Sequence, residues 1–292
     1  MLMFDLSQTF SRIRLRGSTR IDLLQRMSTG DLLKMQPGEG RATVLTTPIG
    51  RMIDYLLVLA HDDSLLLLGQ GGAREKTLRW LRKHIFFNDD VQVSDETETT
   101  EMKGIFGGWD SYRILPLVAS LPSAHLSQFL GHVATSRSLV VRAPQQLGEG
   151  FFVIKPSEAM ERVATEGDPY DWNDYRVTHG YPAFPNEISE DYIPLEAGLW
   201  GAVSFSKGCY TGQEIIARME SRNQIAKKLC VLTGEVEAGA ELFSETGEPV
   251  GKVTSATRGA ALGYIRSAFA AENTSLRTAK SDVVLVTKIV RA

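Results

Sequence analysis

The sequence predicts an α+β fold with a smaller all-β part at its C-terminal end. Over the first ninety residues, runs typical of strands are joined by short turns and interrupted by helical patterns. After Lys227 the pattern changes to short strands separated by glycine-containing turns, which is typical of a small barrel or sandwich. The domain boundary is therefore predicted near Ile225, with residues 1–225 and 226–292 as the two parts.

The first lobe is predicted to alternate strands with two amphipathic helices. A strand at Ser11–Leu15 precedes a helix that carries Ile21, Leu24 and Met27 on one face. Ser18 or Thr19 is its expected N-cap, and Gly30 is the expected stop. The elements expected next are strands at Ala42–Thr47, Met52–His61 and Ser64–Gly69, a helix over Ala73–Phe87 and a strand at Val91–Val93.

A fainter version of this order follows and predicts a second lobe at roughly residues 100–155. Ser94–Met102 reads as either a loop or an edge strand. The other expected elements are a strand near Ile114–Ala119, a helix from Pro122 to His132, strands at Leu139–Arg142 and Phe151–Ile154, and a helix opening at Pro156. The two lobes could be an internal structural repeat.

Composition excludes several classes of protein. The 292 residues include 32 Lys plus Arg and 35 Asp plus Glu, a net charge of −3, which excludes a broadly basic nucleic-acid binder. Two cysteines are too few for a disulfide scaffold or a closed zinc site, and the five histidines have no metal-ligand spacing. With no signal peptide and no apolar run near the ~20 residues that span a bilayer, we expect a soluble, cytoplasmic protein without a bound metal.

The segment from Lys207 to Arg218, KGCYTGQEIIAR, is the most informative stretch for chemistry. Thr211 and Glu214 have the spacing of a capping box, so a helix is predicted to begin directly after them. Cys209 would then lie before a helix N-terminus and beside Lys207, and both would favour a thiolate. The alternative is a buried thiol in a capping loop, where free Cys behaves as a small hydrophobe.

Asp54 is the second candidate, because it shares one face of a predicted strand with aliphatic side chains. A carboxylate in such surroundings must find partners or shift its pKa upward. It either faces a ligand and takes part in proton transfer, or bonds a neighbouring turn at the start of its strand.

Three weaker features each have a structural and a functional interpretation. The glycine-rich turn 69–72 either is a plain turn or presents N–H groups to an anion. A group of aromatic residues between positions 170 and 184 either forms core or stacks a flat heterocycle. A group of basic residues after Cys209 either forms a solvated face or holds the anionic tail of a ligand. The aromatic residues are Tyr170, Trp172, Tyr175, Tyr181 and Phe184, and the basic residues are Arg218, Arg222, Lys227 and Lys228.

The octapeptide KGCYTGQE resembles the signature of the YgfZ family, folate-binding relatives of the aminomethyltransferase (T-protein) of the glycine cleavage system. Its fixed positions are Lys207, Gly208, Cys209, Gly212, Gln213 and Glu214. Four further segments are similar to the family pattern: GRMID around Asp54, WNDYRV with Gly180 and Pro182, and the closing segments TGEPVG and ALGY. The sequence departs from the transferases at Thr178, where they carry a Glu that grips the pterin, and from YgfZ proteins at Gly198, where they carry Asn.

The resemblance implies a ring of two related α+β lobes and a C-terminal β-barrel around a central folate cavity. It implies tetrahydrofolate, or a one-carbon derivative, as the cofactor. The expected folate contacts are Asp54, Tyr175, Arg176, Glu196 and Arg218, and the expected catalytic residues are Asp54 and Cys209.

Two functions remain open at this point. The first is a tetrahydrofolate-binding accessory protein for assembly or repair of iron–sulfur enzymes, including tRNA-modifying ones, in which Cys209 acts transiently on client proteins. One thiol cannot complete a cluster site, since clusters usually take four protein ligands. The second is a folate-dependent one-carbon transferase of the aminomethyltransferase type, which gives Cys209 no role. Neither involves direct contact with nucleic acid or membrane.

Overall fold

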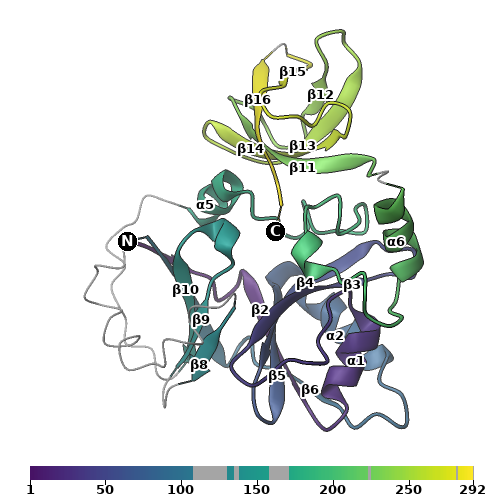
Figure 1. Ribbon diagram of the computed structural model, residues 1–292. Helices are drawn as coiled ribbons and strands as arrows, with labels where there is room; N and C mark the ends of the chain where they lie inside the picture. The colour runs from purple at the N-terminus through teal and green to yellow at the C-terminus, as the bar shows by residue number, and fades with distance from the viewer. Residues whose placement is uncertain (108–129, 135–137, 158–170, 223–224, 281, 292) are drawn as a thin grey trace.

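Three β-sheets form the framework of the protein in a computed structural model (Figure 1). The structure describes residues 1–107, 130–134, 138–157, 171–222, 225–280 and 282–291. Two five-stranded sheets form the two lobes of the first part, and a closed barrel forms the last. The barrel lies at the top of Figure 1, with one lobe below it on the left and the other on the right.

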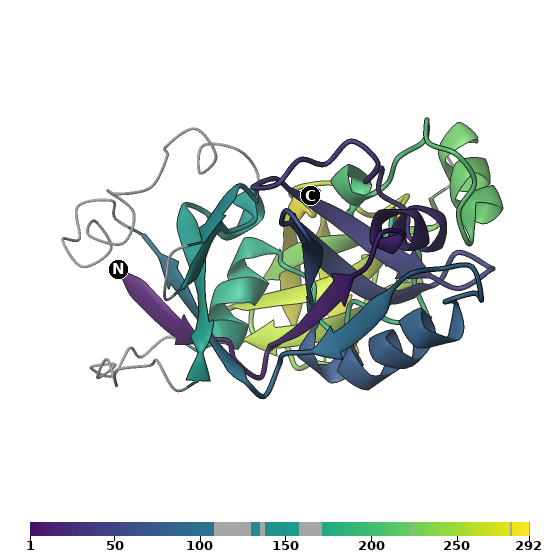
Figure 2. The same ribbon diagram turned by 90° about the horizontal axis from the view of Figure 1, so that it is seen from below.

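The first lobe is an antiparallel sheet with the strand order β3-β4-β5-β2-β6. Leu24 of helix α1 and Leu78 and Leu81 of helix α2 pack with Ile13 and Leu67 on one face of this sheet. Figure 2 shows both helices on the side of the molecule away from the second sheet. The bounds are β2 Phe10–Arg16, α1 Arg20–Met27, β3 Gly40–Thr46, β4 Met52–Ala60, β5 Ser64–Gln70, α2 Arg74–Lys83 and β6 Gln92–Asp95.

The second lobe has the order β1-β7-β10-β9-β8, which repeats the pairing of the first. In each sheet, four successive strands pair so that the first lies beside the fourth: β2 beside β5, and β7 beside β10. The internal repeat suggested by the sequence is therefore present at the level of topology. The bounds are β1 Leu2–Asp5, β7 Thr100–Phe106, β8 His132–Ala134, β9 Leu139–Arg142 and β10 Gly150–Pro156.

The C-terminal part is a closed six-stranded barrel, as the sequence predicted. Its strand order is β11-β14-β13-β12-β15-β16, and its interior is filled by aliphatic side chains such as Leu232, Val253 and Val286. The predicted domain division near Ile225 stays a prediction; the barrel strands begin two residues later. The bounds are β11 Lys227–Thr233, β12 Glu241–Phe243, β13 Pro249–Thr257, β14 Ala260–Arg266, β15 Ser275–Thr278 and β16 Val283–Ile289.

The segment from α5 (Trp172–His179) to α6 (Gln213–Ser221) connects all three sheets. Tyr192 O accepts from Met52 N of the first lobe, and Glu196 O accepts from Leu229 N of the barrel. Trp172 and Tyr175 of α5 belong to an aromatic cluster with Phe4 and Phe106 of the second sheet. The predicted aromatic residues therefore pack as core where the structure describes them; Tyr170 lies outside the described residues.

Several predicted helix ends are wrong. Helix α1 ends at Met27 rather than near Gly30, and its N-cap, Thr19, makes no side-chain cap. Thr19 Oγ1 instead accepts from Asp90 N, because the loop before β6 passes beside it. Helix α2 stops at Lys83, four residues before Phe87, where Asp89 accepts from Phe86 N in a turn.

Predictions for the middle of the second lobe fall largely outside the described residues. This holds for the strand near 114–119, most of the helix over 122–132 and the helix after Pro156. The predicted end of the first helix at His132 is wrong, because His132 begins strand β8. The predicted start of the second helix at Pro156 is also wrong, because Pro156 ends strand β10.

Candidate functional site

Asp54 lies on β4 with no exposed surface, and both of its carboxylate oxygens are held. Oδ1 accepts from Gln70 N at 3.0 Å, and Oδ2 accepts from Thr77 Oγ1 of α2 at 2.6 Å. These contacts come from the end of β5 and from the helix that covers the sheet. Asp54 therefore bonds partners far from the turn at the start of its own strand.

Burial raises the pKa of Asp54 to about 7, and the hydrogen bonds from Thr77 and Gln70 oppose this shift only in part. An ordinary Asp titrates near 4. At neutral pH the carboxyl group of Asp54 therefore exists in both protonation states, which suits a group that holds or releases a proton.

Two buried hydroxyl groups near Asp54 have no hydrogen-bond partner among the described residues: Ser11 Oγ and Tyr181 Oη. An added Cβ on Gly69 would lie 2.5 Å from Asp54 Oδ2 and 2.8 Å from Ser11 Oγ, so the two groups flank the same point. Burial raises the pKa of Tyr181 well above its usual range, and the charges of Tyr55 and Asp54 raise it further. Unpartnered buried hydroxyls are uncommon and fit a place where a polar ligand supplies the missing partner.

Arg176 and Tyr175 use their polar atoms within the protein. Arg176 Nη1 pairs with Glu187 Oε2 at 3.0 Å, and its Nη2 donates to Ser255 Oγ of the barrel at 2.8 Å. Tyr175 Oη donates to Leu147 O at 2.6 Å, and its ring packs on Phe106. Their predicted folate contacts stay predictions, since these interactions would compete with a ligand.

Glu196 and Arg218 lie in different surroundings. Glu196 is buried, and burial raises its pKa; its Oε2 accepts from Ile193 N at 3.1 Å and lies 3.9 Å from Arg51 Nη1. Arg218 is exposed on α6 and pairs with Glu214 one turn away at 2.9 Å. Thr178, the position of the transferase Glu, is exposed and bonds Asp174 O. These residues do not meet Asp54 in any contact that the structure records.

Lys207 fixes the KGCYTGQE loop to the end of α1. Its Nζ donates to the backbone oxygens of Gln25, Ser28 and Gly30 at 2.6, 2.8 and 2.6 Å. Burial lowers the pKa of Lys207 to about 8. An ammonium group has three N–H donors, and all three are used here, so none remains for Cys209. The predicted pairing of Lys207 with a thiolate is therefore not formed.

Cys209 itself is exposed, which rules out the alternative of a buried thiol. The predicted capping box is absent, since α6 begins at Gln213 and its N-cap, Gly212, carries no side chain. Gly212 has φ +85°, and a Cβ there would lie 2.7 Å from Thr47 O, so this position requires glycine. The Thr211 hydroxyl instead contacts Met27 Sδ at 3.9 Å, and Glu214 pairs with Arg218.

We expect Lys207→Met to destabilise the protein by about 2–3 kcal/mol, because three backbone oxygens at the end of α1 lose a charged donor. Urea unfolding of the variant measures this loss. Lys34→Met removes an exposed lysine nearby and is the matched control. Equal stability of the two variants would contradict the proposed fixing role.

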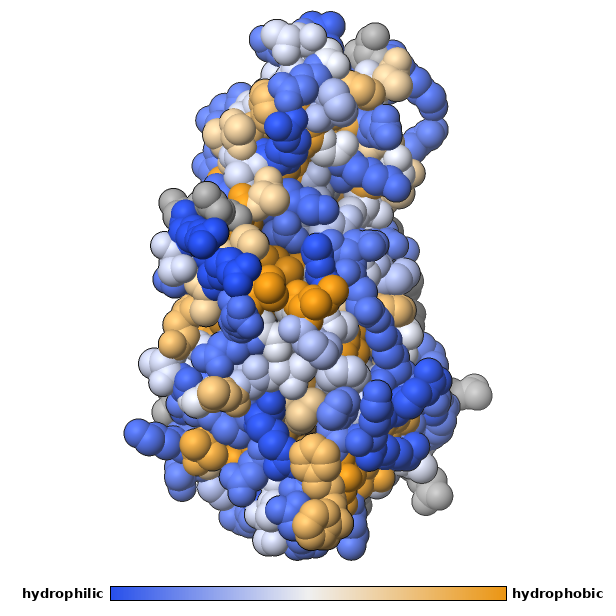
Figure 3. Space-filling model, turned by 90° about the vertical axis from the view of Figure 1, so that its right-hand side faces the viewer, coloured by the Kyte–Doolittle hydropathy of each residue, from blue (hydrophilic) through white to orange (hydrophobic). Residues whose placement is uncertain are grey.

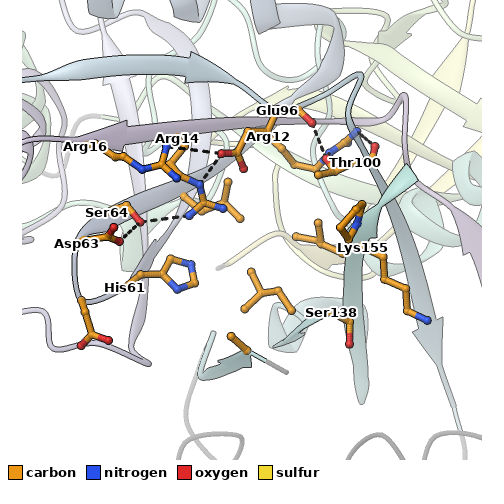
Figure 4. Close-up of a pocket in the computed structure, with 16 residues that line it drawn as sticks. Arg12, Arg14, Arg16, His61, Asp63, Ser64, Glu96, Thr100, Ser138 and Lys155 are labelled. Carbon is orange, nitrogen blue, oxygen red and sulfur yellow. Dashed lines mark hydrogen bonds and ion pairs between the residues drawn. The ribbon is translucent and has the colours of Figure 1, made fainter. Parts of the chain in front are cut away.

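A separate hollow of about 610 Å³ lies between the two sheets (Figure 4). Arg14, Arg16 and His61 line one side, and Leu139 and Ile154 line the other. Glu96 pairs with Arg14 at 2.6 Å and lies 3.9 Å from Arg16. None of the catalytic, folate-binding or signature residues predicted from the sequence lines this hollow.

Known proteins match the chain over most of its length. The model of the GCVT N-terminal domain matches residues 1–126, and that of the CAF17 C-terminal β-barrel domain matches residues 218–289. The crystal structure of glycine cleavage system aminomethyltransferase T from Bartonella henselae superposes with a TM-score of 0.82 at 21% identity, covering 98% of this chain and 84% of that one. The fold is that of the aminomethyltransferases.

Proteins similar in sequence are named either as transferases or as a tRNA-modifying protein. An Arabidopsis thaliana protein named "Putative transferase, chloroplastic" is 30% identical over 91% of this chain, which spans 65% of that protein's length. The aminomethyltransferase of Bacillus subtilis is 24% identical over 99% of this chain and 85% of its own. The tRNA-modifying protein YgfZ of Hamiltonella defensa is 27% identical over 76% of this chain and 67% of its own.

Two further findings concern membranes and metals. Each helix within the described ranges is too short or too polar to cross a bilayer. In the part of the chain that the structure describes, no group of three or more His, Cys, Asp and Glu side chains is placed to hold a metal ion.

Proposed function

We propose that this protein binds tetrahydrofolate and supports the assembly or repair of iron–sulfur enzymes, including tRNA-modifying ones, through Cys209. The observation that carries the folate part is the buried carboxyl group of Asp54 beside two unpartnered hydroxyls. The observation that favours the accessory role is an exposed thiol in a loop fixed by Lys207.

Asp54, Ser11 and Tyr181 would hold a polar ring that offers both donors and acceptors. Tetrahydrofolate, when bound, supplies a carrier for one-carbon units. Asp54 would accept or donate a proton next to it, because its pKa lies near neutrality. Since Asp54 has no exposed surface, the ligand reaches it only when neighbouring side chains move.

Cys209 would act on client proteins at the surface, away from the buried carboxyl group. Its exposure allows contact with a second protein, whereas Cys230 lies buried in the barrel, where burial raises the pKa of its thiol to about 12. Cys209 is therefore the thiol suited to exchange with partners.

A folate-dependent aminomethyltransferase is the second candidate, and the Bacillus subtilis relative favours it. It requires Asp54 but gives no role to Cys209. Thr178 counts against it, because this exposed hydroxyl stands where the transferases are expected to carry a Glu on the pterin.

Calorimetric titration of the anaerobic protein with tetrahydrofolate tests the folate site. We expect micromolar binding by the wild type, a loss of at least about tenfold in Asp54→Asn, and unchanged binding in Cys209→Ala. No binding by the wild-type protein would contradict both candidate functions.

The same variants separate the two candidates in cells that depend on this chain. Loss of iron–sulfur enzyme activity in Cys209→Ala, with folate binding intact, is the result expected for the accessory role. Full iron–sulfur enzyme activity in Cys209→Ala would favour the transferase. The cytoplasmic location stays a prediction, and the Arabidopsis relative is named as chloroplastic.

A further inference from the structure

Thr77 is a polar residue on the buried face of α2. It has no exposed surface, and its neighbours on that face, Leu78 and Leu81, pack in the aliphatic core of the first lobe. A Thr hydroxyl within a helix commonly donates to the carbonyl oxygen one turn back. Thr77 Oγ1 instead donates to Asp54 Oδ2 at 2.6 Å. Valine would fill a similar volume without burying a hydroxyl, so the hydrogen bond to Asp54 is what a threonine adds at this position.

The two carboxyl oxygens of Asp54 face different kinds of hydrogen-bonding group. Oδ1 accepts from Gln70 N, and a backbone amide can only donate, so Oδ1 has to remain an acceptor. Oδ2 faces Thr77 Oγ1, and a hydroxyl can either donate or accept. A proton bound by Asp54 therefore resides on Oδ2.

Oδ2 is also the oxygen that lies beside the unpartnered hydroxyl of Ser11. A Cβ added to Gly69 would lie 2.5 Å from Asp54 Oδ2 and 2.8 Å from Ser11 Oγ, and Oδ1 is not among its three nearest atoms. Glycine inside a strand often marks the close approach of a ligand or of another segment. A ligand atom placed beside Gly69 would therefore meet Oδ2 and Ser11 Oγ together.

Solvent does not reach Asp54 or Thr77, because neither residue has exposed surface. Helices α1 and α2 lie toward the right of Figure 1, which is the side that Figure 3 views. Most residues on that face are hydrophilic, and neither Thr77 nor Asp54 contributes to it. A hydrogen bond in such buried surroundings has a larger electrostatic effect than one in water.

We propose that Thr77 is a positioning residue of the folate site, whose hydroxyl holds Asp54 Oδ2 in place and stabilises the carboxylate once its proton has left. This inference rests on the proposed function. The step concerns one proton, which leaves Oδ2 for an acceptor atom of the ligand. Thr77 Oγ1 then donates to the carboxylate that remains, so charge and protons balance.

The test first follows the carboxyl group of Asp54 itself, in the full chain without ligand. The probe is its side-chain carboxyl carbon NMR signal between pH 5 and pH 10, which Asp54→Asn identifies by its absence. Thr77→Val should raise the pKa of Asp54 by about one pH unit, because the charged form loses a hydrogen bond that favours it. Thr77→Ser keeps the hydroxyl and should titrate like the wild type.

Other titratable groups near Asp54 stay in place in these variants. The charge of Lys76 on α2 lowers the pKa of Asp54, and Tyr181 remains uncharged because burial raises its own pKa well above the usual range. Thr29→Val is the matched control, since it removes an equally buried hydroxyl that donates to Ala202 O at 2.6 Å. It should leave the titration of Asp54 unchanged.

Two further measurements connect this titration to binding and to folding. The tetrahydrofolate Kd, measured by calorimetry, should change with pH near the pKa of Asp54, and in Thr77→Val that change should move upward by about one pH unit. In urea, the folding equilibrium constant of Thr77→Val relative to the wild type should fall about tenfold from pH 5 to pH 9. That of Thr29→Val should be lowered by the same factor at both pH values.

Three results would overturn the inference: an unchanged pKa of Asp54 in Thr77→Val, an equal shift in Thr29→Val, and a Thr77→Ser variant that titrates like Thr77→Val. A pH dependence of the Kd that stays in place while the pKa of Asp54 moves would also overturn it. Failure of the wild type to bind tetrahydrofolate, with the pKa raised in Thr77→Val, would instead contradict the proposed function and leave the link between Thr77 and Asp54 standing.

Discussion

Replacement of Glu187 by Ala is expected to destabilise the protein by about 3–5 kcal/mol, because it leaves a buried charge without its partner. Glu187 has no exposed surface. Its Oε2 pairs with Arg176 Nη1 at 3.0 Å, and its Oε1 accepts from Ser255 Oγ at 2.7 Å. Urea unfolding at pH 7 measures the loss.

Two controls show whether the charge is the cause. Arg176→Met with Glu187→Leu removes both charges and should recover more than half of the lost stability, since a buried pair contributes little compared with apolar packing. Lys280→Ala breaks an exposed pair with Glu237 and should have little measurable effect. A loss below about 1 kcal/mol in Glu187→Ala would contradict the expectation.

This network also explains how the barrel is held on the first part of the chain. Arg176 belongs to α5 and Ser255 to β13, so the ion pair joins a helix of the connecting segment to a barrel strand. Tyr264 Oη of β14 donates to Glu187 O at 2.8 Å and extends the same contact. Glu187 and Arg176 thus join the connecting segment to two strands of the barrel.

Elements defined by local patterns were predictable from the sequence. The run of apolar residues over β4 and β5 fixed both strands to within one residue of their observed ends. β1 was missed, because its four residues carry little pattern of their own. It forms by pairing with β7 about a hundred residues away, with Leu2 opposite Phe106.

Predictions that depended on a side chain's partner fared less well. Thr19 and Thr211 were expected to cap helices, but each hydroxyl contacts another segment of the chain instead. The same reason limits the candidate site. Asp54 was found from its place among aliphatic residues, whereas Thr77 and Ser11 come to it from two separate segments that carry no motif. Tyr181 was named only as one of the aromatic candidates, and its position near Asp54 was not predicted.

Asp54→Asn is expected to stabilise the protein relative to the wild type, by an amount that grows by about 2–3 kcal/mol from pH 5 to pH 8. Burial raises the pKa of Asp54 to about 7 in the folded protein, against about 4 in the unfolded chain. Between these values the folded state holds a proton that the unfolded state has released, so the wild type loses stability as pH rises. The Asn variant carries no charge and escapes this loss.

Urea unfolding of both proteins at pH 5 and pH 8 measures the effect, with Asp22→Asn, an exposed carboxylate on α1, as the matched control. A pH-independent difference would mean that Asp54 ionises as it does in the unfolded chain, and the site would lose its proton-holding group. A variant that is more stable at pH 8 yet fails to bind tetrahydrofolate would attribute the lost binding to the carboxyl group itself, because unfolding could not explain it. The wild type would then be less stable than the Asn variant because it keeps a buried carboxyl group. Such a loss of stability is expected where the group is needed for function.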